Sequence, residues 1–390
     1  MPSLLMLTLS DCKSLDYFPQ IVGRMNALRT IDASGSGLKE LPPSIGNLSA
    51  LESLFIASCN SLRELPNSFL TLQNLRLLIM GGMQPRVRKS LKKLMQESQR
   101  AINWTNIEYL DLENSGLLDE DVDLILKCCQ NLKLLFLSRN DFVSLSECIK
   151  QFANLSMLKI EGCKRLRHVP ELPPRLLHIY ALNCTSLSTE SSGRLWSQIN
   201  HAKEGSRVLI QMPATTFPDW FDHCSKGGTL SLRVRGKNFP RAIVAFELGK
   251  AKPRKRIYFG VFMRINGRKM SWVESDVPYQ PDETRQGRVY KFDSMQGHVV
   301  LSDLLQKFRE EDLERLDKFL ELGWNVVDIQ IRCKSPANMS IVNCGICVDK
   351  QQTDMENIAF LPPTVFSLNS SRKSLKRKAV ASPLNKSAKK

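Results

Sequence analysis

The feature that most constrains this chain is an internal repeat that fills its first half. The pattern Leu-x-x-Leu-x-Leu-x-x-(Asn/Cys/Ser), with some replacements, occurs eight times, and successive copies start 21 to 32 residues apart. The copies start at Leu4, Leu28, Leu51, Leu75, Ile107, Leu132, Leu155 and Leu176. A unit this short cannot bury its own apolar side chains, so consecutive units must stack into a continuous core.

The spacing within each copy predicts one coil of a leucine-rich-repeat solenoid. The Leu-x-Leu part predicts a short strand whose alternate side chains enter the core. We expect the Asn, Cys or Ser position to turn inward and to bond to backbone groups of the next coil. Cysteines at this position have a structural role rather than a metal-binding or redox role, and they are Cys12, Cys59, Cys163 and Cys184.

One repeat is longer than the others. Residues 81–104 hold six basic residues and one acid, and Leu91, Leu94 and Met95 have the spacing of a short amphipathic helix. A solvated insertion is the favoured interpretation, and a partner-binding helix is the alternative.

The sequence also begins inside a repeat, whereas solenoids need polar caps at both ends. We therefore expect the chain to be the C-terminal part of a longer protein or a truncated gene model.

Beyond Leu187 the repeat stops and a different pattern begins. Residues 188–206 are mostly polar, with one apolar pair at Leu195 and Trp196. Short apolar or alternating segments then predict strands at residues 229–235, 242–248, 257–265, 269–274, 325–333 and 339–348. An Asn-Gly pair between two of these segments is a strong hairpin signal. Short strands at this spacing predict a β-sandwich.

One amphipathic helix is predicted among these strands. Ser302 can cap its N-terminus, apolar residues from Leu304 to Leu320 share one side, and Gly323 ends it. Packing against the sandwich is the favoured interpretation, and docking to a partner is the alternative.

Several segments resemble a known family. Glu171–Leu187, ELPPRLLHIYALNCTSL, resembles the last repeat of plant intracellular immune receptors of the TIR–nucleotide-binding–leucine-rich-repeat class. Met212–His223, MPATTFPDWFDH, resembles the P-x-W-F opening of the domain that follows those repeats. His298–Asp303 and the C-G strand Asn343–Val348 resemble two of its strands. The resemblance implies a jelly-roll and Ig-like β-sandwich, also called the C-JID or post-LRR domain.

The sequence departs from that family at three positions. Ala214, Phe217 and Gly297 stand where glycine, isoleucine and an acid are usual, which leaves details of the second sheet open.

The predicted fold is an α/β leucine-rich-repeat solenoid followed by a mainly β sandwich. Its predicted parts are the solenoid at 1–187, a connector at 188–206, the sandwich at 207–365 and a basic disordered tail at 366–390.

No motif in the sequence predicts catalysis. Ser225–Thr229 lacks the spacing of a phosphate-binding loop. Cys344 and Cys347 resemble half of a zinc site, but no second pair or histidine follows at ligand spacing, and thiols three apart on a strand point to opposite faces. His223 and Cys224 are neighbours, which rarely form a productive nucleophile pair. We therefore expect no enzyme activity, no cofactor and no metal.

What remains is recognition on the concave face of the solenoid. Residues on either side of the buried leucine of each strand point to this face, where uncovered large apolar side chains would be costly without a partner. The predicted protein-binding residues are Phe55, Ile79, Tyr109, Asp111, Glu113, Phe136, Lys159, Glu161 and Tyr180. The alternative is that some of these side chains cover one another or pack on the β-sandwich.

The resemblance implies a function in plant innate immunity. The partner would be a pathogen effector or a guarded host protein, bound by the concave face and the sandwich loops. Two alternatives belong to other classes. One is a leucine-rich-repeat scaffold or substrate receptor, for example in ubiquitin ligation. The other is nucleic-acid binding through the basic tail, which is the less expected kind of partner.

The net charge of +16 is concentrated at the C-terminus. Residues 371–390 hold eight basic residues and no acid, so the other 370 residues carry about half of the charge. The tail is either a solvated segment or a nuclear localisation signal that binds importin, through Lys376, Arg377, Lys378, Lys386, Lys389 and Lys390. No run of 18 apolar residues exists to span a membrane. We expect the protein in the cytoplasm and nucleus.

Overall fold

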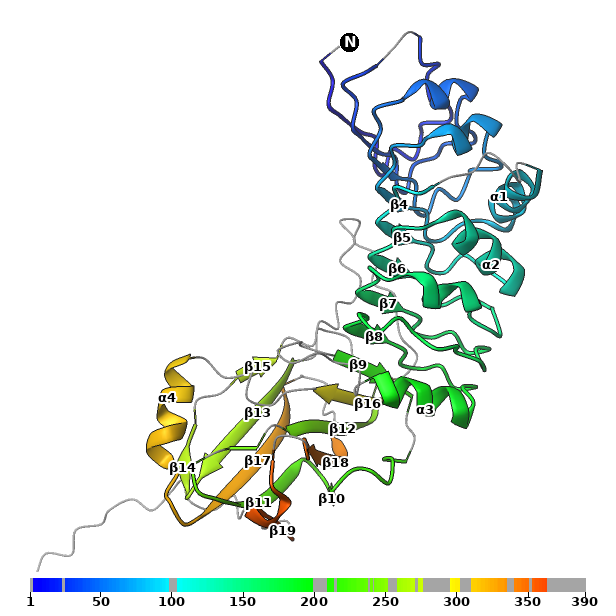
Figure 1. Ribbon diagram of the computed structural model, residues 1–390. Coiled ribbons are helices and arrows are strands. Elements are labelled where there is room, and N and C mark those ends of the chain that lie inside the picture. Colours follow the sequence, from blue (N-terminus) through cyan, green and yellow to red (C-terminus); the bar gives the residue numbers. More distant parts are fainter. Residues whose placement is uncertain are drawn as a thin grey trace, which may run out of the picture.

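A computed structural model contains two connected parts, a solenoid of eight coils and a second unit built from two β-sheets (Figure 1). It describes residues 3–22, 25–97, 104–198, 209–213, 216–237, 239–240, 242–251, 258–270, 273–275, 295–301, 310–334, 340–350 and 353–362. The six basic tail residues predicted as a nuclear signal lie outside the described residues.

The solenoid contains β1 (Met6–Thr8), β2 (Thr30–Asp32), β3 (Ser53–Phe55), β4 (Leu77–Ile79), α1 (Pro85–Glu97), β5 (Tyr109–Asp111), α2 (Asp119–Cys128), β6 (Leu134–Phe136), β7 (Met157–Lys159), β8 (His178–Tyr180) and α3 (Thr189–Ser197). The second unit contains β9 (Leu209–Met212), β10 (His223–Lys226), β11 (Thr229–Arg235), β12 (Ala242–Ala251), β13 (Tyr258–Ile265), β14 (Arg268–Lys269), β15 (Val273–Ser275), β16 (Met295–Leu301), α4 (Glu310–Phe319), β17 (Trp324–Lys334), β18 (Ile341–Val348) and β19 (Ile358–Leu361). Short 3-10 helices lie at Pro43–Asn47, Asn67–Thr71, Glu147–Gln151 and Met355–Asn357.

Each solenoid strand is three residues long and turns its middle side chain into the core. In β3, Leu54 is fully buried while Ser53 and Phe55 are half-buried on the concave face. Strands β1 to β8 pair in parallel, so equivalent residues of neighbouring coils lie side by side. Figure 1 shows these strands on one side of the solenoid and α1, α2 and α3 on the other. The strands predicted from the leucine spacing are confirmed.

A buried polar ladder joins successive coils. The Oδ1 atom of Asn140 accepts hydrogen bonds from the backbone N–H groups of Ser115 and Leu117, each at 3.0 Å. Its Nδ2 atom donates to the carbonyl oxygens of Leu112 and Leu137, each at 2.9 Å. One amide side chain thus satisfies four buried backbone groups, three of them in the coil before it.

Cysteines fill the same ladder position in three other coils. Their Sγ atoms donate to carbonyl oxygens of the preceding coil: Cys59 to Ala33 at 3.1 Å, Cys163 to Leu137 at 3.3 Å and Cys184 to Ile160 at 2.9 Å. The bonds reach the preceding coil, so the expected direction toward the next coil is wrong. Burial raises the pKa of all three thiols, which keeps them protonated and unreactive. Cys12, in the first coil, is exposed instead.

A residue with positive φ stands directly before the ladder position in every coil. The eight φ values lie between 51° and 76°, at Asp11, Gly35, Ser58, Gly82, Asn114, Arg139, Gly162 and Asn183. This left-handed conformation costs about 1–2 kcal/mol for a residue with a Cβ, and it is easiest for glycine and asparagine. It reverses the chain after the strand and lets the next side chain turn inward.

The long repeat contains α1, which packs on the convex side. Val87, Leu91 and Leu94 are buried in the solenoid core, so the helix predicted here is confirmed. Arg88 forms an ion pair with the buried carboxylate of Asp121 in α2, with an N–O distance of 3.1 Å. The apolar side of the insertion therefore belongs to the core and is not solvated.

The parallel sheet of the solenoid continues into the second unit. β9 pairs in parallel with β8, and the backbone N–H of Ala181 donates to the carbonyl of Gln211 at 2.7 Å. The sheet then runs through β16, β12 and β18 to β10, which gives thirteen strands. The second sheet has the order β14-β13-β17-β11-β19, and β15 pairs with β13.

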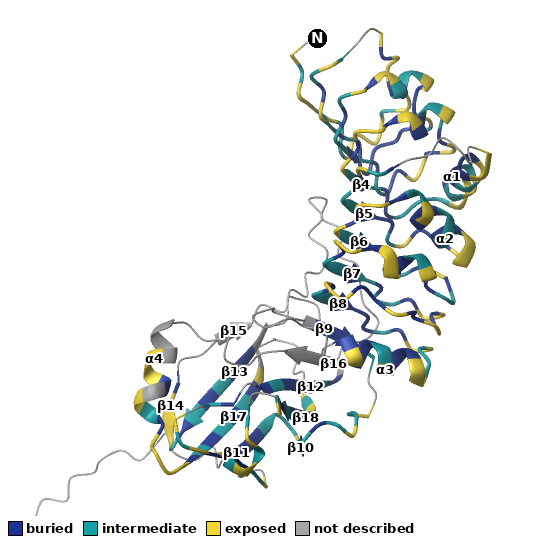
Figure 2. Ribbon diagram, in the orientation of Figure 1, coloured by how far each residue is buried: buried dark blue, intermediate teal, exposed yellow. Residues whose placement is uncertain are grey.

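The two sheets of the second unit share one apolar core. Alternate side chains of β12 and β18 in the larger sheet, and of β11, β13 and β17 in the smaller one, belong to the same buried cluster. Figure 2 shows this alternation along β13 and β17. The predicted strands correspond to β11, β12, β13, β17 and β18, and segment 269–274 overlaps β14 and β15. The strands β9, β10 and β19 were not predicted.

Aromatic side chains join α3 to the second unit. The ring centre of Trp196 lies 5.5 Å from that of Phe221 and 6.1 Å from that of Trp220. Phe217 lies 6.1 Å from Trp196 and 5.1 Å from Phe221. A Cβ at Gly345 would lie 2.8 Å from the Phe221 ring, so any larger residue at this strand position would displace that ring. The P-x-W-F and C-G motifs therefore meet at the junction of the two parts.

α4 covers part of the second core. Its Leu316 and the following Leu320 are buried in that core, which confirms that an amphipathic helix packs on the sheets. The predicted cap, Ser302, lies outside the described residues.

Removal of the central ladder amide tests this account of stability. The substitution Asn140→Ala leaves four backbone groups without their side-chain partner, and each such group costs about 1 kcal/mol or more when buried. We expect the free energy of unfolding, measured with urea, to fall by about 3 kcal/mol or more. Cys163→Ser keeps a donor at the equivalent position and is the control, with a loss of about 1 kcal/mol or less. Equal losses would contradict the ladder's role.

Candidate protein-binding surface

Half-buried apolar side chains form a strip on the concave face of β3 to β6. In the strand pairing, Phe55 lies beside Ile79. Leu77 lies beside Tyr109, and Tyr109 lies beside Leu134. All five side chains are half-buried. We call these five residues the apolar strip; the binding prediction named three of them, and Leu77 and Leu134 are additions.

Beyond β6 the same face is closed by its own side chains. The Nζ atom of Lys159 lies 4.3 Å from the ring centre of Phe136 and 5.6 Å from that of Tyr180. The ring of Tyr109 packs against Phe136, with centres 4.9 Å apart. Phe136 is 9% exposed, and Tyr180 is 3% exposed in the core of the second unit. The expectation that these two rings are exposed is wrong: Phe136 is covered by neighbouring side chains of the face, and Tyr180 packs in the core of the second unit, which are the two forms of the alternative.

The charged residues predicted for this face are also largely engaged. Asp111 is buried, and its Oδ1 accepts from the backbone N–H of Glu113 at 2.9 Å. Glu113 forms an ion pair with Arg139 at 3.1 Å, and both side chains are mostly buried. Burial, assisted by the charge of Glu161, raises the pKa of Tyr180 to about 12. These groups therefore fix the shape of the face, and the apolar strip is the part of β3 to β6 where apolar side chains stay partly accessible.

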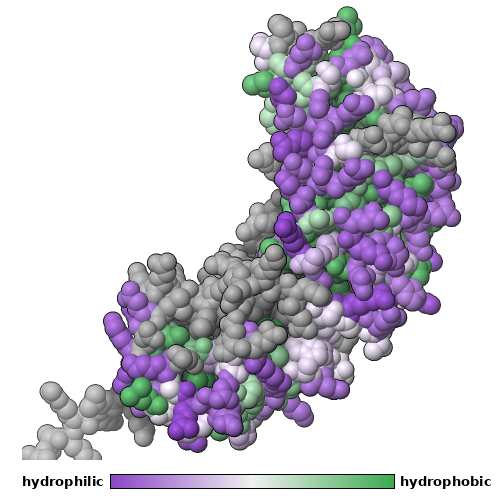
Figure 3. All heavy atoms as spheres, viewed as in Figure 1, coloured by the Kyte–Doolittle hydropathy of each residue, from purple (hydrophilic) through white to green (hydrophobic). Residues whose placement is uncertain are grey.

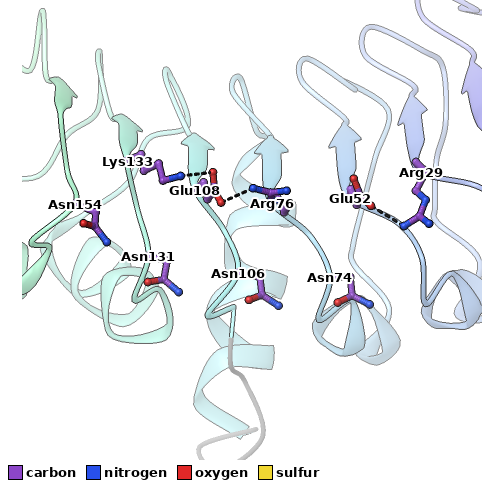
Figure 4. Close-up of a pocket in the computed structure, with 9 residues that line it drawn as sticks. All are labelled: Arg29, Glu52, Asn74, Arg76, Asn106, Glu108, Asn131, Lys133 and Asn154. Carbon is purple, nitrogen blue, oxygen red and sulfur yellow. Dashed lines mark hydrogen bonds and ion pairs between the residues drawn. The ribbon is translucent and has the colours of Figure 1, made fainter.

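A row of alternating charges borders the apolar strip. Each member stands one position before a strand, and the row reads Arg29, Glu52, Arg76, Glu108 and Lys133. The N–O distances are 2.6 Å for Arg29 and Glu52, 2.7 Å for Arg76 and Glu108, and 2.9 Å for Lys133 and Glu108 (Figure 4). The hydrogen bonds from Lys133 and Arg76 lower the pKa of Glu108.

A second row lies beneath the charges and consists of Asn74, Asn106, Asn131 and Asn154 (Figure 4). The first three donate from Nδ2 to carbonyl oxygens of the preceding coil, at distances between 2.6 and 2.9 Å. Both rows line a hollow of about 560 Å³. Because its cations and acids pair with one another, this hollow offers hydrogen bonds more than net charge.

Sequence reasoning missed both rows. The signal was present, because the residue before each predicted strand alternates in sign through five coils, and Asn precedes the first leucine of the pattern in four. These residues became a site only when parallel pairing placed equivalent positions side by side.

The described residues contain no group of three or more His, Cys, Asp or Glu side chains able to hold a metal ion. Cys344 packs in the core between the two sheets, whereas Cys347 packs on the other face of β18. Burial raises the pKa of both thiols to about 12. The opposite orientation expected for this pair is confirmed.

The sequence of the repeats matches a known family. Residues 1–203, slightly more than half of the chain, match the family model described as the leucine-rich repeats of RPS4B-like disease resistance proteins. This chain belongs to that family. The resemblance to plant disease resistance proteins is thereby confirmed for the repeats.

Two curated relatives that are similar in sequence to this chain are also plant resistance proteins. The chain is 30% identical over 221 residues to TMV resistance protein N of Nicotiana glutinosa, which covers 45% of this chain and 19% of that protein. It is 26% identical over 274 residues to disease resistance protein RPS4B of Arabidopsis thaliana, covering 60% and 22% respectively. The chain thus spans about a fifth of the length of these relatives. Among solved structures, the Leptospira interrogans LRR protein LIC12759 is 20% identical, with a TM-score of 0.35, and covers 52% of this chain and 54% of that one.

The described part of this RPS4B-like chain has no helix with both the length and the apolar character needed to cross a bilayer. In the view of Figure 3, the surface of the repeats is mainly hydrophilic, with apolar side chains gathered in small patches.

The charge row predicts a dependence of stability on pH. The pKa of Glu108 is depressed in the folded chain, so its pairs stabilise the fold above the unfolded-state pKa of about 4.3 and lose this effect as pH falls through the folded value. We expect Glu108→Gln to lower the unfolding free energy at neutral pH by about 0.5–1 kcal/mol, and the difference to shrink below about pH 4.3 and to vanish once Glu108 is protonated in the folded chain. Glu97→Gln, which breaks one 3.8 Å pair, is the control. A pH-independent difference would contradict this assignment.

The difference in burial between two aromatic residues of this face is also testable. Phe136→Ala should cost about 3 kcal/mol of unfolding free energy because its ring is enclosed by Tyr109 and Lys159. Phe55→Ala, at a half-buried position, should cost about 1 kcal/mol. Urea unfolding of both variants measures the difference. A larger loss for Phe55→Ala would show that the apolar strip is a packed region and not an accessible one.

Proposed function

We propose that this chain is a recognition module of a plant immune receptor and that the apolar strip binds a protein, either a pathogen effector or a guarded host protein. The observation that carries the proposal is the composition of the concave face. Half-buried Phe55, Leu77, Ile79, Tyr109 and Leu134 form an apolar centre, and the row from Arg29 to Lys133 borders it. Protein interfaces have this composition, with aromatic and aliphatic anchors at the centre and polar groups at the rim.

The charged row at the rim of the apolar strip favours a partner that binds through hydrogen bonds and complementary shape. Its charges already pair within the chain, so a bulk electrostatic attraction contributes little. A partner can instead exchange one ion pair for another at a fixed spacing, which provides selectivity. The ladder and the parallel sheet hold the strip rigidly, which lowers the conformational entropy lost on binding.

Membership of the RPS4B-like family supports the immune context of this proposal. We assign the whole receptor to the TIR–nucleotide-binding–leucine-rich-repeat class, and this chain to its non-catalytic, ligand-reading part. We assign the second unit, at 207–365, to the jelly-roll and Ig-like C-JID type, because two facing sheets follow the repeats with the P-x-W-F and C-G motifs at their junction. In this proposal the chain acts in the cytoplasm and nucleus, with the basic tail as the nuclear signal.

The test is a binding assay with matched leucine substitutions. Individually expressed pathogen effectors are screened against the chain in Nicotiana leaves, with a photo-crosslinking amino acid at Tyr109. Affinities of the captured effectors are then measured for Leu134→Arg, on the strip, and for Leu118→Arg, an exposed leucine before α2. We expect Leu134→Arg to weaken binding at least tenfold, as for an interface anchor, and Leu118→Arg to change it less than twofold.

The opposite pattern would overturn the proposed surface. If effectors that bind the unmodified chain bind Leu134→Arg equally well, the apolar strip is not the recognition site. Circular dichroism of both variants separates loss of binding from loss of folding.

A further inference from the structure

The outward face of the six-stranded sheet carries a group of basic side chains. Leu230, Leu232 and Val234 of β11 enter the core, so Arg233 and Arg235 between and after them point outward and are exposed. Figure 1 shows β13, β17 and β11 side by side in this sheet. The neighbouring strands add further cations to the same face: Arg264 of β13, Lys269 of β14 and Arg332 of β17.

The cations of this face outnumber the acids in the described part of the chain. Asp328 stands directly opposite Arg264 in the β13–β17 pairing and accepts a hydrogen bond from Ser231 at 2.8 Å. Glu274 of β15 is paired with Gly260. Arg233, Arg235 and Lys269 have no ion-pair partner among the described residues. The contrast with the solenoid is clear, because the charge row there pairs internally. An unbalanced group of this kind favours an anionic ligand.

Aromatic rings lie among the cations. Trp324, 43% exposed, stands directly opposite Arg235 in the β11–β17 pairing. The guanidinium of Arg332 lies 4.8 Å from the ring centre of Phe262 and donates to Gln330 at 2.6 Å. A hollow of about 240 Å³ opens here, lined in part by Phe262, Arg264, Lys269, Gln330 and Arg332. It therefore combines a stacking surface, an amide for hydrogen bonding and three positive charges.

We propose that this face binds single-stranded nucleic acid. Exposed cations would contact the phosphates, and Arg is favoured for this because its planar guanidinium forms paired hydrogen bonds with phosphate oxygens. Trp324 and the Phe262–Arg332 pair would stack on bases, which any base permits. A sheet face presents no helix or ribbon for a duplex groove, so the single-stranded form fits better. The site is separate from the apolar strip and does not depend on the proposed function.

The basic tail is the main confounding factor, and a charge-matched comparison removes it. Fluorescence anisotropy of labelled oligo-dT and oligo-U of about 20 nucleotides is measured with the purified full chain over a range of salt concentrations. One variant carries Arg233→Gln, Arg235→Gln and Lys269→Gln. The other carries Lys376→Gln, Arg377→Gln and Lys378→Gln. Each variant loses three positive charges, and the first removes no ion pair among the residues that the structure describes.

The two variants give opposite expectations. The sheet variant should bind at least tenfold more weakly, and its slope of log Kd against log salt should fall by about two, since each contact contributes about 0.7. The tail variant should stay within about threefold of the unmodified chain. Absence of binding by the unmodified chain, or equal or larger loss in the tail variant, would overturn the proposal.

A neutral substitution tests the stacking component. Trp324→Ala should weaken binding about fivefold or more without changing the salt slope, while Trp324→Phe should keep most of the affinity. An equal affinity of Trp324→Ala and Trp324→Phe for oligo-U would contradict stacking.

Poly-glutamate is the competitor that separates binding of nucleic acid from binding of an acidic protein segment. Displacement of oligo-U at equal residue concentration would show that the face reads charge alone and would reject the assignment to nucleic acid.

Discussion

The solenoid depends on buried hydrogen bonds that each coil makes to the coil before it. A coil of about 24 residues is too small to enclose its own backbone, and an unsatisfied buried group costs about 1–3 kcal/mol. Asn140 satisfies four such groups, and Cys59, Cys163 and Cys184 each satisfy one. The positive-φ residue before each ladder position aims these side chains inward. Burial of the leucines then supplies stability, and the hydrogen bonds of the polar ladder determine how each coil is positioned on the coil before it.

This geometry determines what the concave face can present. Parallel pairing aligns equivalent positions, so a row of alternating charges and a row of asparagines form from residues about 23 to 32 apart in sequence. The same alignment closes the far end of the face, where Lys159 lies between Phe136 and Tyr180. The apolar strip of β3 to β6 therefore ends where these rings close the face, and the exposed Met6 of β1 lies toward the other end of the sheet. Since β9 extends the sheet, the second unit is continuous with the face and packs on its last coil.

Local patterns predicted much of this fold, and contacts between distant segments account for what they missed. The Leu-x-Leu spacing identified every solenoid strand because each strand buries its side chains within its own and adjacent coils. The clean alternation of residues 229–235 identified β11 with its bounds. By contrast, β9 has four residues, and its pairing with β8 and β16 joins segments about 30 and 90 residues away. Tyr180 was expected on the surface because the core that buries it is formed by later strands.

The most direct measurement of the ladder and the continuous sheet is native-state hydrogen exchange. Three amides report on them: Ser115 and Leu117, which donate to Asn140, and Ala181, which donates to Gln211. If successive coils and the second unit form one cooperative structure, all three exchange only by global unfolding and share one free energy of exchange. Fast exchange of Ala181, with protection of the other two amides, would contradict the continuity of the sheet. Fast exchange of Ser115 and Leu117 would contradict the ladder.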